Sequence, residues 1–204
     1  MIHIQNLTKT YNGKNVFSNL NMDIVENDYT SLCGDSGIGK TTLLRIIAGL
    51  EKYDKGTITG LEGKRISYVF QEDRLFPWLN VMDNILLVME HTAENMRYIS
   101  LKEKREYNKE QVRKILSMLQ LRNVEKLMPS ELSGGMKRRV SIARALAYDS
   151  DILLLDEAFK GLQDSLKWTV INNIKEYLSG KPRTVICATH NIEIAYEMTY
   201  NLKL

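Results

Sequence analysis

The feature that most constrains the fold of this chain is a glycine-rich segment at residues 34–41. It reads Gly-Asp-Ser-Gly-Ile-Gly-Lys-Thr and matches the pattern G-x-x-x-x-G-K-S/T at every fixed position. Residues 29–33 before it predict a compact strand, and the helical spacing of residues 41–50 after it predicts a helix. Glycines in this position let backbone N–H groups turn towards phosphate oxygens, and the helix N-terminus adds positive potential. The segment therefore predicts a loop that binds phosphate.

The chemistry expected of this loop depends on a few polar side chains. The residues expected to contact the phosphates are Gly34, Asp35, Ser36, Gly37, Ile38, Gly39, Lys40, Thr41 and Thr42. Lys40 would place its charge on the β- and γ-phosphates, and the Thr41 hydroxyl would be a Mg²⁺ ligand. The apolar strand predicted at residues 152–155 ends in two acids, Asp156 and Glu157. We expect Asp156 to complete the Mg²⁺ site and Glu157 to polarise an attacking water.

Composition excludes several other classes of protein. A charged fraction of 26% beside 44% hydrophobic residues excludes a disordered or collagen-like chain. The net charge of +3 is too small to indicate nucleic-acid binding. The longest apolar runs, residues 85–89 and 152–155, are far shorter than the roughly 20 residues of a membrane-spanning helix, and we expect no signal peptide. Cys33 and Cys187 lack C-x-x-C spacing and are expected to be buried, reduced thiols.

The apolar pattern along the chain predicts an α/β protein with a single domain over residues 1–204. Strands are expected at residues 16–25, 29–33, 56–59, 65–70, 152–155 and 184–188, with a further helix at about 165–178. Residues 12–13 predict an Asn-Gly turn. Residues 81–121 contain no glycine and have apolar residues at helical spacing. We expect a mainly parallel core sheet, an N-terminal antiparallel β subdomain, and a helical subdomain inserted at about residues 81–145.

A second motif indicates the family. Residues 132–139 read Leu-Ser-Gly-Gly-Met-Lys-Arg-Arg, which resembles the signature motif of ATP-binding cassette ATPases. Ser133 would cap the helix that follows, and Gly134 and Gly135 would leave backbone N–H groups free to meet a phosphate. The resemblance implies a P-loop NTPase fold. It also implies that this phosphate is the γ-phosphate held by a second copy of the domain, so that two cassettes enclose two ATP molecules head to tail.

Three more residues take their expected roles from this resemblance alone. Tyr11 would stack on adenine, and Gln71 would sense Mg²⁺ and link the site to a transport subunit. His190 would contact the γ-phosphate. The catalytic set is then Lys40, Gln71, Glu157 and His190, the metal ligands are Thr41, Gln71 and Asp156, and the cofactors are ATP and Mg²⁺.

The sequence departs from the family pattern at two places. Many members have glutamine where this chain has Met136, and related importers often have methionine there as well. After Glu157 the family usually reads Pro-Phe-Ser-Ala-Leu-Asp, whereas residues 158–163 read Ala-Phe-Lys-Gly-Leu-Gln. Gln163 thus replaces an acid that helps the two nucleotide sites communicate, and Asp164 lies one position further on. We expect hydrolysis to be kept, because the catalytic set is unchanged.

A third stretch indicates what the cassette works with. Residues 69–81 look like the corresponding stretch of nitrate, sulfonate and taurine importers, whose cassettes are chains separate from the permease. By that resemblance Phe76, Pro77, Trp78 and Leu79 would form the groove for a coupling helix of the permease, the alternative being ordinary core of the helical subdomain. An external solute-binding protein would be an indirect partner. The cassette would be cytoplasmic and peripheral on the inner face of the cell membrane.

Two charged features of the sequence are not taken to indicate nucleic-acid binding. Arg138 and Arg139 are expected to be solvated or to face the membrane subunit. The charge-rich residues 102–114 are expected to form the solvated face of a helix.

Three alternative functions stay open at this point. A soluble cassette protein that takes no part in transport would usually need two cassettes or a long insertion. A weakly hydrolysing interaction subunit is suggested by the altered residues 160–163. A small P-loop kinase would lack the Ser-Gly-Gly stretch at residues 133–135.

Overall fold

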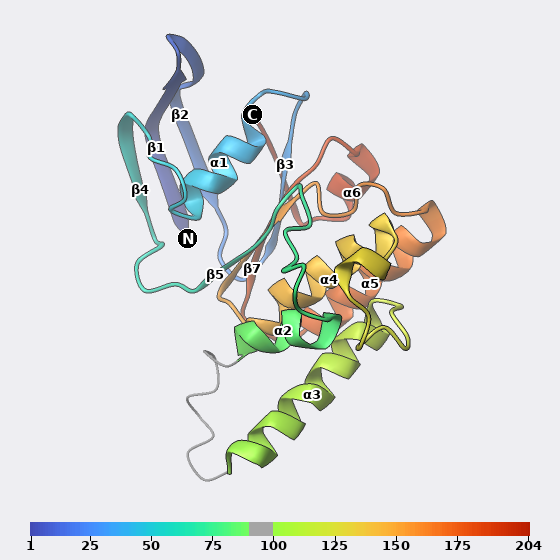
Figure 1. Ribbon diagram of the computed structural model, residues 1–204. Helices are drawn as coiled ribbons and strands as arrows, with labels where there is room; N and C mark the ends of the chain where they lie inside the picture. The colour runs from blue at the N-terminus through green and yellow to red at the C-terminus, as the bar shows by residue number, and fades with distance from the viewer. Residues whose placement is uncertain (90–99) are drawn as a thin grey trace. The chain divides into compact units, whose positions relative to one another are not determined.

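The computed structural model describes residues 1–89 and 100–204, apart from the side chain of Lys203. These residues form two compact units (Figure 1). The first unit, here called the sheet unit, comprises residues 1–68, 150–157 and 181–204. The second, here called the helical unit, comprises residues 69–149 and 158–180, and the predicted helical subdomain at 81–145 falls within it.

The N-terminal part of the sheet unit is an antiparallel sheet of order β2-β1-β4. Its strands are β1 (Ile2–Tyr11), β2 (Lys14–Ile24) and β4 (Lys55–Thr59). Asn12 and Gly13 join β1 to β2 with φ of +48° and +79°. Two consecutive positive φ values are what a two-residue hairpin of this kind requires, and they confirm the predicted Asn-Gly turn.

The core of the sheet unit is a five-stranded sheet of order β5-β6-β7-β3-β8. Its strands are β5 (Ile66–Val69), β6 (Ile152–Asp156), β7 (Thr184–Ala188), β3 (Tyr29–Cys33) and β8 (Tyr200–Lys203). The pairs β6–β7, β7–β3 and β3–β8 are parallel, and every residue of β6 and β7 is buried. Parallel strands end at one edge of the sheet, so the segments that follow β3, β6 and β7 meet there. The α/β class with a parallel core sheet is confirmed.

Helix α1 (Lys40–Ile47) packs against β6 and β7 of the same unit. It ends three residues before the predicted residue 50 because Gly49 adopts φ +69°. The Gly49 N–H donates to Ile46 O at 3.0 Å, and the Leu50 N–H donates to Arg45 O at 2.9 Å. This pair of bonds is the Schellman motif, which satisfies the last carbonyls of a helix. A second helix, α6 (Ile192–Tyr196), packs on β3 and was not predicted from the sequence.

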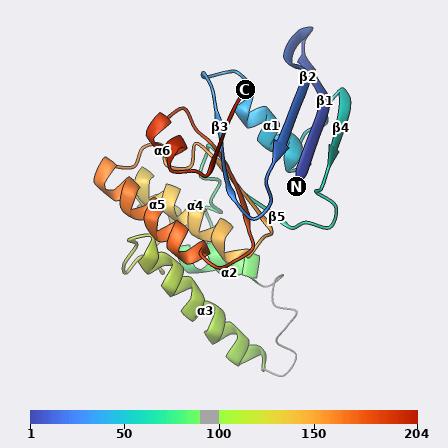
Figure 2. The ribbon, with the colours of Figure 1, turned by 180° about the vertical axis from the view of Figure 1, so that it is seen from behind.

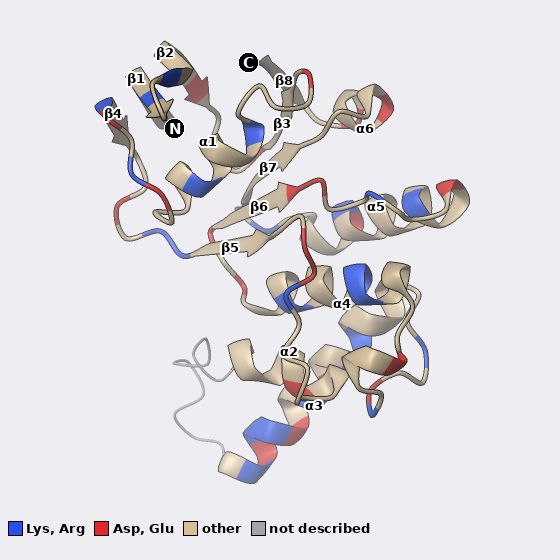
Figure 3. Cartoon of the chain, turned by 45° about the horizontal axis from the view of Figure 1, so that its top comes forward, with Lys and Arg blue, Asp and Glu red and all other residues tan. Residues whose placement is uncertain are grey.

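The helical unit contains α2 (Val81–Met89), α3 (Leu101–Met118), α4 (Gly134–Ala147) and α5 (Asp164–Leu178), with a 3₁₀ turn at Pro129–Glu131. Helices α2, α3 and α4 contact one another, and α5 contacts α3 (Figure 2). Basic and acidic segments alternate along α3 (Figure 3), and most of the charged residues at 102–114 are exposed, as predicted. Among the described residues, no helix combines the length and apolar character that crossing a membrane requires.

Two expectations about side-chain environment were wrong. Arg138 and Arg139 are buried, each only 8% exposed, rather than solvated or presented to a partner. The reason is that both guanidinium groups donate to carbonyl oxygens of loops in the same unit; Arg139, for example, donates to Leu119 O and Gln120 O at 3.0 and 2.7 Å. Cys187 is buried as expected, and burial raises its pKa to about 12, but Cys33 is partly exposed.

One buried amide fixes the loop before α2. The side chain of Asn84 is fully buried; its Oδ1 accepts from the Phe76 N–H at 2.8 Å. Its Nδ2 donates to the carbonyl oxygens of Phe76, Leu79 and Asn80 at 3.1, 2.8 and 3.0 Å. These bonds hold both ends of residues 76–80 against the start of α2.

Replacing Asn84 by alanine should lower the free energy of unfolding by about 2–4 kcal/mol, because several part-buried backbone groups lose a hydrogen-bond partner. Chemical denaturation monitored by circular dichroism measures this. Asn80→Ala is the matched control: its Oδ1 accepts from the Asp83 N–H at 2.8 Å at the helix start, and its loss should cost about 1 kcal/mol. Equal losses for the two variants would contradict the assigned role of Asn84.

Candidate active site

The glycine-rich loop lies between β3 and α1, where the sequence predicted it. Gly39 is the residue before α1 and has φ +112°. A Cβ atom at this position would lie 2.6–2.7 Å from side-chain atoms of Val16 and Phe17. Both the backbone conformation and the packing therefore require glycine, which brings the loop close to β2.

Lys40 supplies a positive charge within the loop. Its side chain is buried, 7% exposed, and its Nζ donates to Gly34 O at 2.6 Å and to Asp35 O at 2.9 Å. Both acceptors are neutral carbonyl oxygens, so the ammonium charge stays available to an anion. A loop of backbone N–H groups with a buried cation at its end fits a bound phosphate chain.

Asp156, the last residue of β6, joins the loop to the sheet. Its carboxylate accepts from Thr41 Oγ1 and from Tyr68 Oη, each at 3.0 Å. Burial raises the pKa of Asp156; the two hydrogen bonds act in the opposite direction, and the nearby Glu157 carboxylate raises it further. A threonine hydroxyl beside a carboxylate offers the hard oxygen ligands that Mg²⁺ prefers. This pair of side chains therefore fits a magnesium ion.

Glu157 and His190 form a hydrogen-bonded pair at the same edge of the sheet. Glu157 Oε1 lies 2.7 Å from His190 Nδ1 and accepts from the His190 N–H at 3.2 Å. Glu157 has φ +49°, a conformation rare for residues other than glycine, and its N–H donates to Ala188 O at 3.0 Å. Backbone strain of this kind is typical of functional positions, where the surrounding structure enforces it. A carboxylate held by histidine at this position can accept a proton from water.

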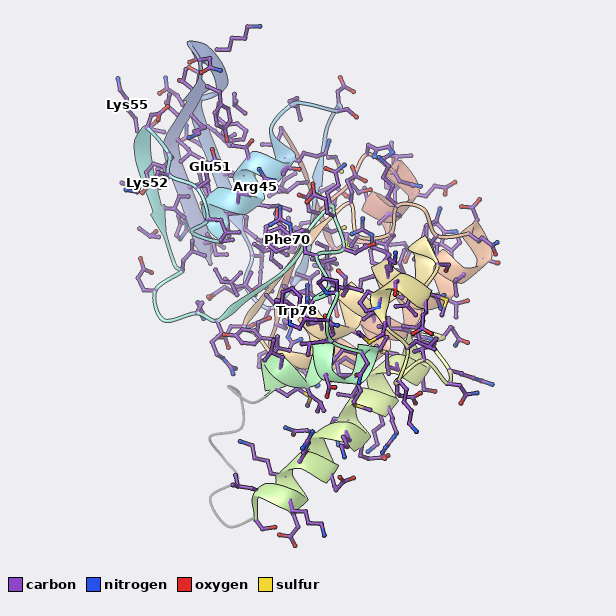
Figure 4. All side chains as sticks on the ribbon, viewed as in Figure 1. Arg45, Glu51, Lys52, Lys55, Phe70 and Trp78 are labelled. Carbon is purple, nitrogen blue, oxygen red and sulfur yellow. The ribbon has the colours of Figure 1, made fainter. Side chains whose placement is uncertain are left out.

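Tyr11, the predicted adenine contact, lies at the end of β1. Its hydroxyl donates to the carboxylate of Glu51, a residue labelled in Figure 4 just after α1. Lys9 lies over the Tyr11 ring at 4.6 Å from Nζ to the centroid, and forms an ion pair with Glu51 at 3.1 Å. The ring is thus fixed by two neighbours while it remains partly exposed.

The remaining predicted residues lie in the helical unit. Ser133 caps α4, and its Oγ accepts from the Met136 N–H at 3.3 Å, which confirms the predicted cap. Ser133 and Gly134 are exposed, so the N-terminus of α4 is presented at the surface of its unit. Gln71 lies in the loop that follows β5, with an exposed side chain. The structure thus brings Lys40, Thr41, Asp156, Glu157 and His190 together in the sheet unit and carries Gln71, Ser133, Gly134 and Gly135 on the helical unit.

Two residues of the site were missed from the sequence. Tyr68 binds the Asp156 carboxylate from the neighbouring strand, and Arg138 binds the backbone of Gln71. Tyr68 belongs to a predicted strand, but nothing in the sequence indicated that β5 would lie beside β6. Arg138 was expected to be solvated or to face the membrane subunit because of its charge, so its contact with Gln71 was not predicted.

Comparison with known proteins shows the family of this chain. The model of the ABC transporter family matches residues 17–160. The chain is 38% identical over 189 residues to an aliphatic sulfonates import ATP-binding protein of Rhodococcus jostii, covering 91% of this chain and 71% of that protein. It is 39% identical over 187 residues to a protein of the same description from Bacillus cereus, covering 88% and 69%.

A solved structure supports the fold independently. The dimeric ATP-binding cassette MJ0796, in a post-hydrolysis state bound to ADP and phosphate, matches with a TM-score of 0.87 and 28% identity. The match covers 100% of this chain and 94% of that one. The chain therefore belongs to the ABC transporter family and is one of its ATP-hydrolysing cassettes.

Proposed function

We propose that this cassette powers an importer, in which ATP binding and hydrolysis drive uptake of a small solute through a separate membrane permease. The observation that carries the hydrolytic part is the pairing of Glu157 with His190 beside the Thr41–Asp156 pair. The import direction is supported by the two relatives described above, whose names are those of import ATP-binding proteins. The cassette would then lie at the inner face of the membrane, bound to its permease.

ATP binding would use the loop at residues 34–42. Backbone N–H groups and the Lys40 ammonium would hold the phosphates, and Tyr11 would stack on adenine. Thr41 and Asp156, with Gln71 from the helical unit, would hold Mg²⁺. When bound, Mg²⁺ neutralises negative charge on the phosphate oxygens.

Hydrolysis would depend on the proton that Glu157 accepts. Its carboxylate would take a proton from the attacking water as that water approaches the γ-phosphate. The hydrogen bonds from His190 hold the carboxylate in place, and the imidazole itself would contact the γ-phosphate.

A second copy of the cassette would complete each site. The exposed N-terminus of α4, at Ser133–Gly135, would direct its free N–H groups and its positive dipole end to the γ-phosphate held by the partner copy. ATP would then hold two cassettes together, and hydrolysis would let them separate. The dimeric cassette described above supports a second copy as the partner.

One feature favours weaker communication between the two sites. Asp164, which lies one position beyond the family's acid, pairs with Lys167 at 2.6 Å on its own helix, and this bond lowers the pKa of Asp164. Gln163 precedes α5 without a side-chain cap bond. The chain would therefore hydrolyse ATP with looser coupling between its sites.

The loop before α2 would bind the permease. Trp78 is 70% exposed, and its ring centroid lies 5.6 Å from that of Phe76, which Arg144 covers from 5.5 Å. Leu79, in the same loop, lines a cavity of about 480 Å³ between α2 and α3. The remaining residues that line it are Asp83, Leu86, Leu87, Leu101, Lys104, Arg105 and Asn108. An exposed aromatic anchor beside an apolar cavity with a polar rim fits an amphipathic helix.

Glu157→Gln should form a stable dimer in ATP, because the amide keeps the shape of the site but accepts no proton. Its hydrolysis rate should fall at least about 100-fold. Size-exclusion chromatography with and without ATP measures dimer formation. The matched control is the double variant with Lys40→Ala, which should stay monomeric because the loop has lost its cation. A monomer in both variants at high protein concentration would rule out the assignment of Glu157.

Trp78→Ala should weaken binding to the permease by about tenfold or more, as expected for an exposed aromatic anchor. ATP affinity should not change, since Trp78 lies outside the phosphate loop. Co-purification with the permease and calorimetry with ATP separate these effects. Leu50→Ala is the control, because Leu50 is also exposed, at 59%, but belongs to the sheet unit. Undiminished permease binding by Trp78→Ala would exclude this loop from the docking surface.

The solute can be identified in vesicles that contain the cassette and its permease. ATPase activity should rise when the external binding protein is loaded with taurine or another alkanesulfonate, and nitrate forms the second arm. Stimulation by nitrate alone would show that the cassette serves a nitrate importer and not a sulfonate importer. ATP hydrolysis that never responds to the permease would refute the importer function and favour a cassette outside transport.

A further inference from the structure

A single buried arginine holds the backbone of the loop that carries Gln71. Arg138 Nη1 donates to Phe70 O at 2.6 Å, and Nη2 donates to Gln71 O. Its Nε lies 3.4 Å from Asp73 Oδ1, an ion pair with the same loop. All three guanidinium nitrogens are thus directed at residues 70–73. The planar fork of a guanidinium can do this, whereas a lysine ammonium is a single point.

The loop at residues 70–74 also has contacts of its own, among them an ion pair between Arg74 and Glu72 at 3.1 Å. Phe70 lies under the guanidinium of Arg74 at 4.0 Å, and Arg74 itself has φ +45° (Figure 4 labels Phe70). Because two successive carbonyl groups are fixed on Arg138, the peptide planes on either side of Gln71 are fixed as well. The direction of the Gln71 Cα–Cβ bond, from which its exposed side chain extends, then follows from Arg138.

Arg138 also belongs to the helix that presents the signature residues. Ser133 caps α4, and Arg138 follows five residues later on the same helix. At about 1.5 Å of rise per residue, the two lie roughly one and a half turns apart on a rigid element. In the proposed dimer, Gln71 serves the nucleotide of its own copy and Ser133 serves the nucleotide of the partner.

We propose that Arg138 is a positioning residue that fixes Gln71 to the signature helix, so that both contacts move together during ATP hydrolysis. This inference rests on the proposed roles of Gln71 and Ser133. Arg138 touches no substrate itself; it acts through the backbone of Gln71. Without it, Gln71 would sample other directions while the helix stayed in place.

Arg139 provides a matched control on the same helix. It is equally buried, but it holds the end of α3 through Leu119 O and Gln120 O, and its Nε donates to Gly135 O at 3.2 Å. Arg138→Gln and Arg139→Gln therefore remove the same group at adjacent positions. Only the first should affect Gln71.

The test is a double-mutant cycle between Arg138→Gln and Gln71→Ala, with kcat and KM for ATP measured for each variant. Arg138→Gln should lower kcat about tenfold with KM nearly unchanged, and the double variant should be no slower than Gln71→Ala alone. The Mg²⁺ dependence of ADP binding, measured by calorimetry, should shift alike in the two single variants. Arg138→Lys should recover part of kcat and serves as the cycle partner if the glutamine variant unfolds.

Arg139→Gln should lower the melting temperature, and any effect that it has on kcat should multiply with the effect of Gln71→Ala, because Arg139 binds the end of α3 and its own helix rather than the Gln71 loop. If the effects of Arg138→Gln and Gln71→Ala multiply in the same way, the positioning role is wrong and the proposed function stands. If Gln71→Ala alone changes neither kcat nor the Mg²⁺ dependence, the proposed role of Gln71 fails and the inference fails with it.

Discussion

The carboxylate of Asp156 is the point on which the hydrolytic site depends. It ends a strand whose every residue is buried, so its charge requires partners inside the sheet unit. Thr41 supplies one from the start of α1, and Tyr68 supplies the other from β5. The phosphate loop, β5 and β6 are thereby held in one arrangement. The next residue, Glu157, adopts a left-handed backbone conformation and binds His190, so two successive acids have different hydrogen-bond partners.

The elements that were predicted well have strong local signals. The Asn-Gly turn, the glycine loop and the fully buried strands β6 and β7 appear within a residue or two of their expected positions. Helix α6 and strand β8 were missed because each is short, and β8 exists through pairing with β3, about 170 residues away in the sequence. The two arginines of α4 were misplaced because their environment, too, depends on residues that are distant in the sequence. Their burial depends on carbonyl groups of loops that no local pattern connects to them.

The residues of the candidate site likewise differ in how strongly the local sequence indicates them. Lys40, Thr41, Asp156 and Glu157 could be found from motifs, because phosphate and magnesium chemistry demands those side chains in that context. Tyr11, Gln71 and His190 came from resemblance to the family, and the structure now gives each a defined environment. Tyr68 and Arg138 could be found only from the structure. Both act by fixing another residue of the site, and a sequence pattern rarely reveals such a role.

In the proposed dimer, each ATP is held by the phosphate loop of one copy and the Ser133–Gly135 cap of the other. Mixing two inactive variants tests it most directly. Lys40→Ala keeps an intact cap, and Ser133→Arg keeps an intact loop, so a mixed pair contains one complete site. ATPase activity, absent from either variant alone, should return on mixing. If the mixture stays as inactive as its components while both remain folded, the composite site is contradicted.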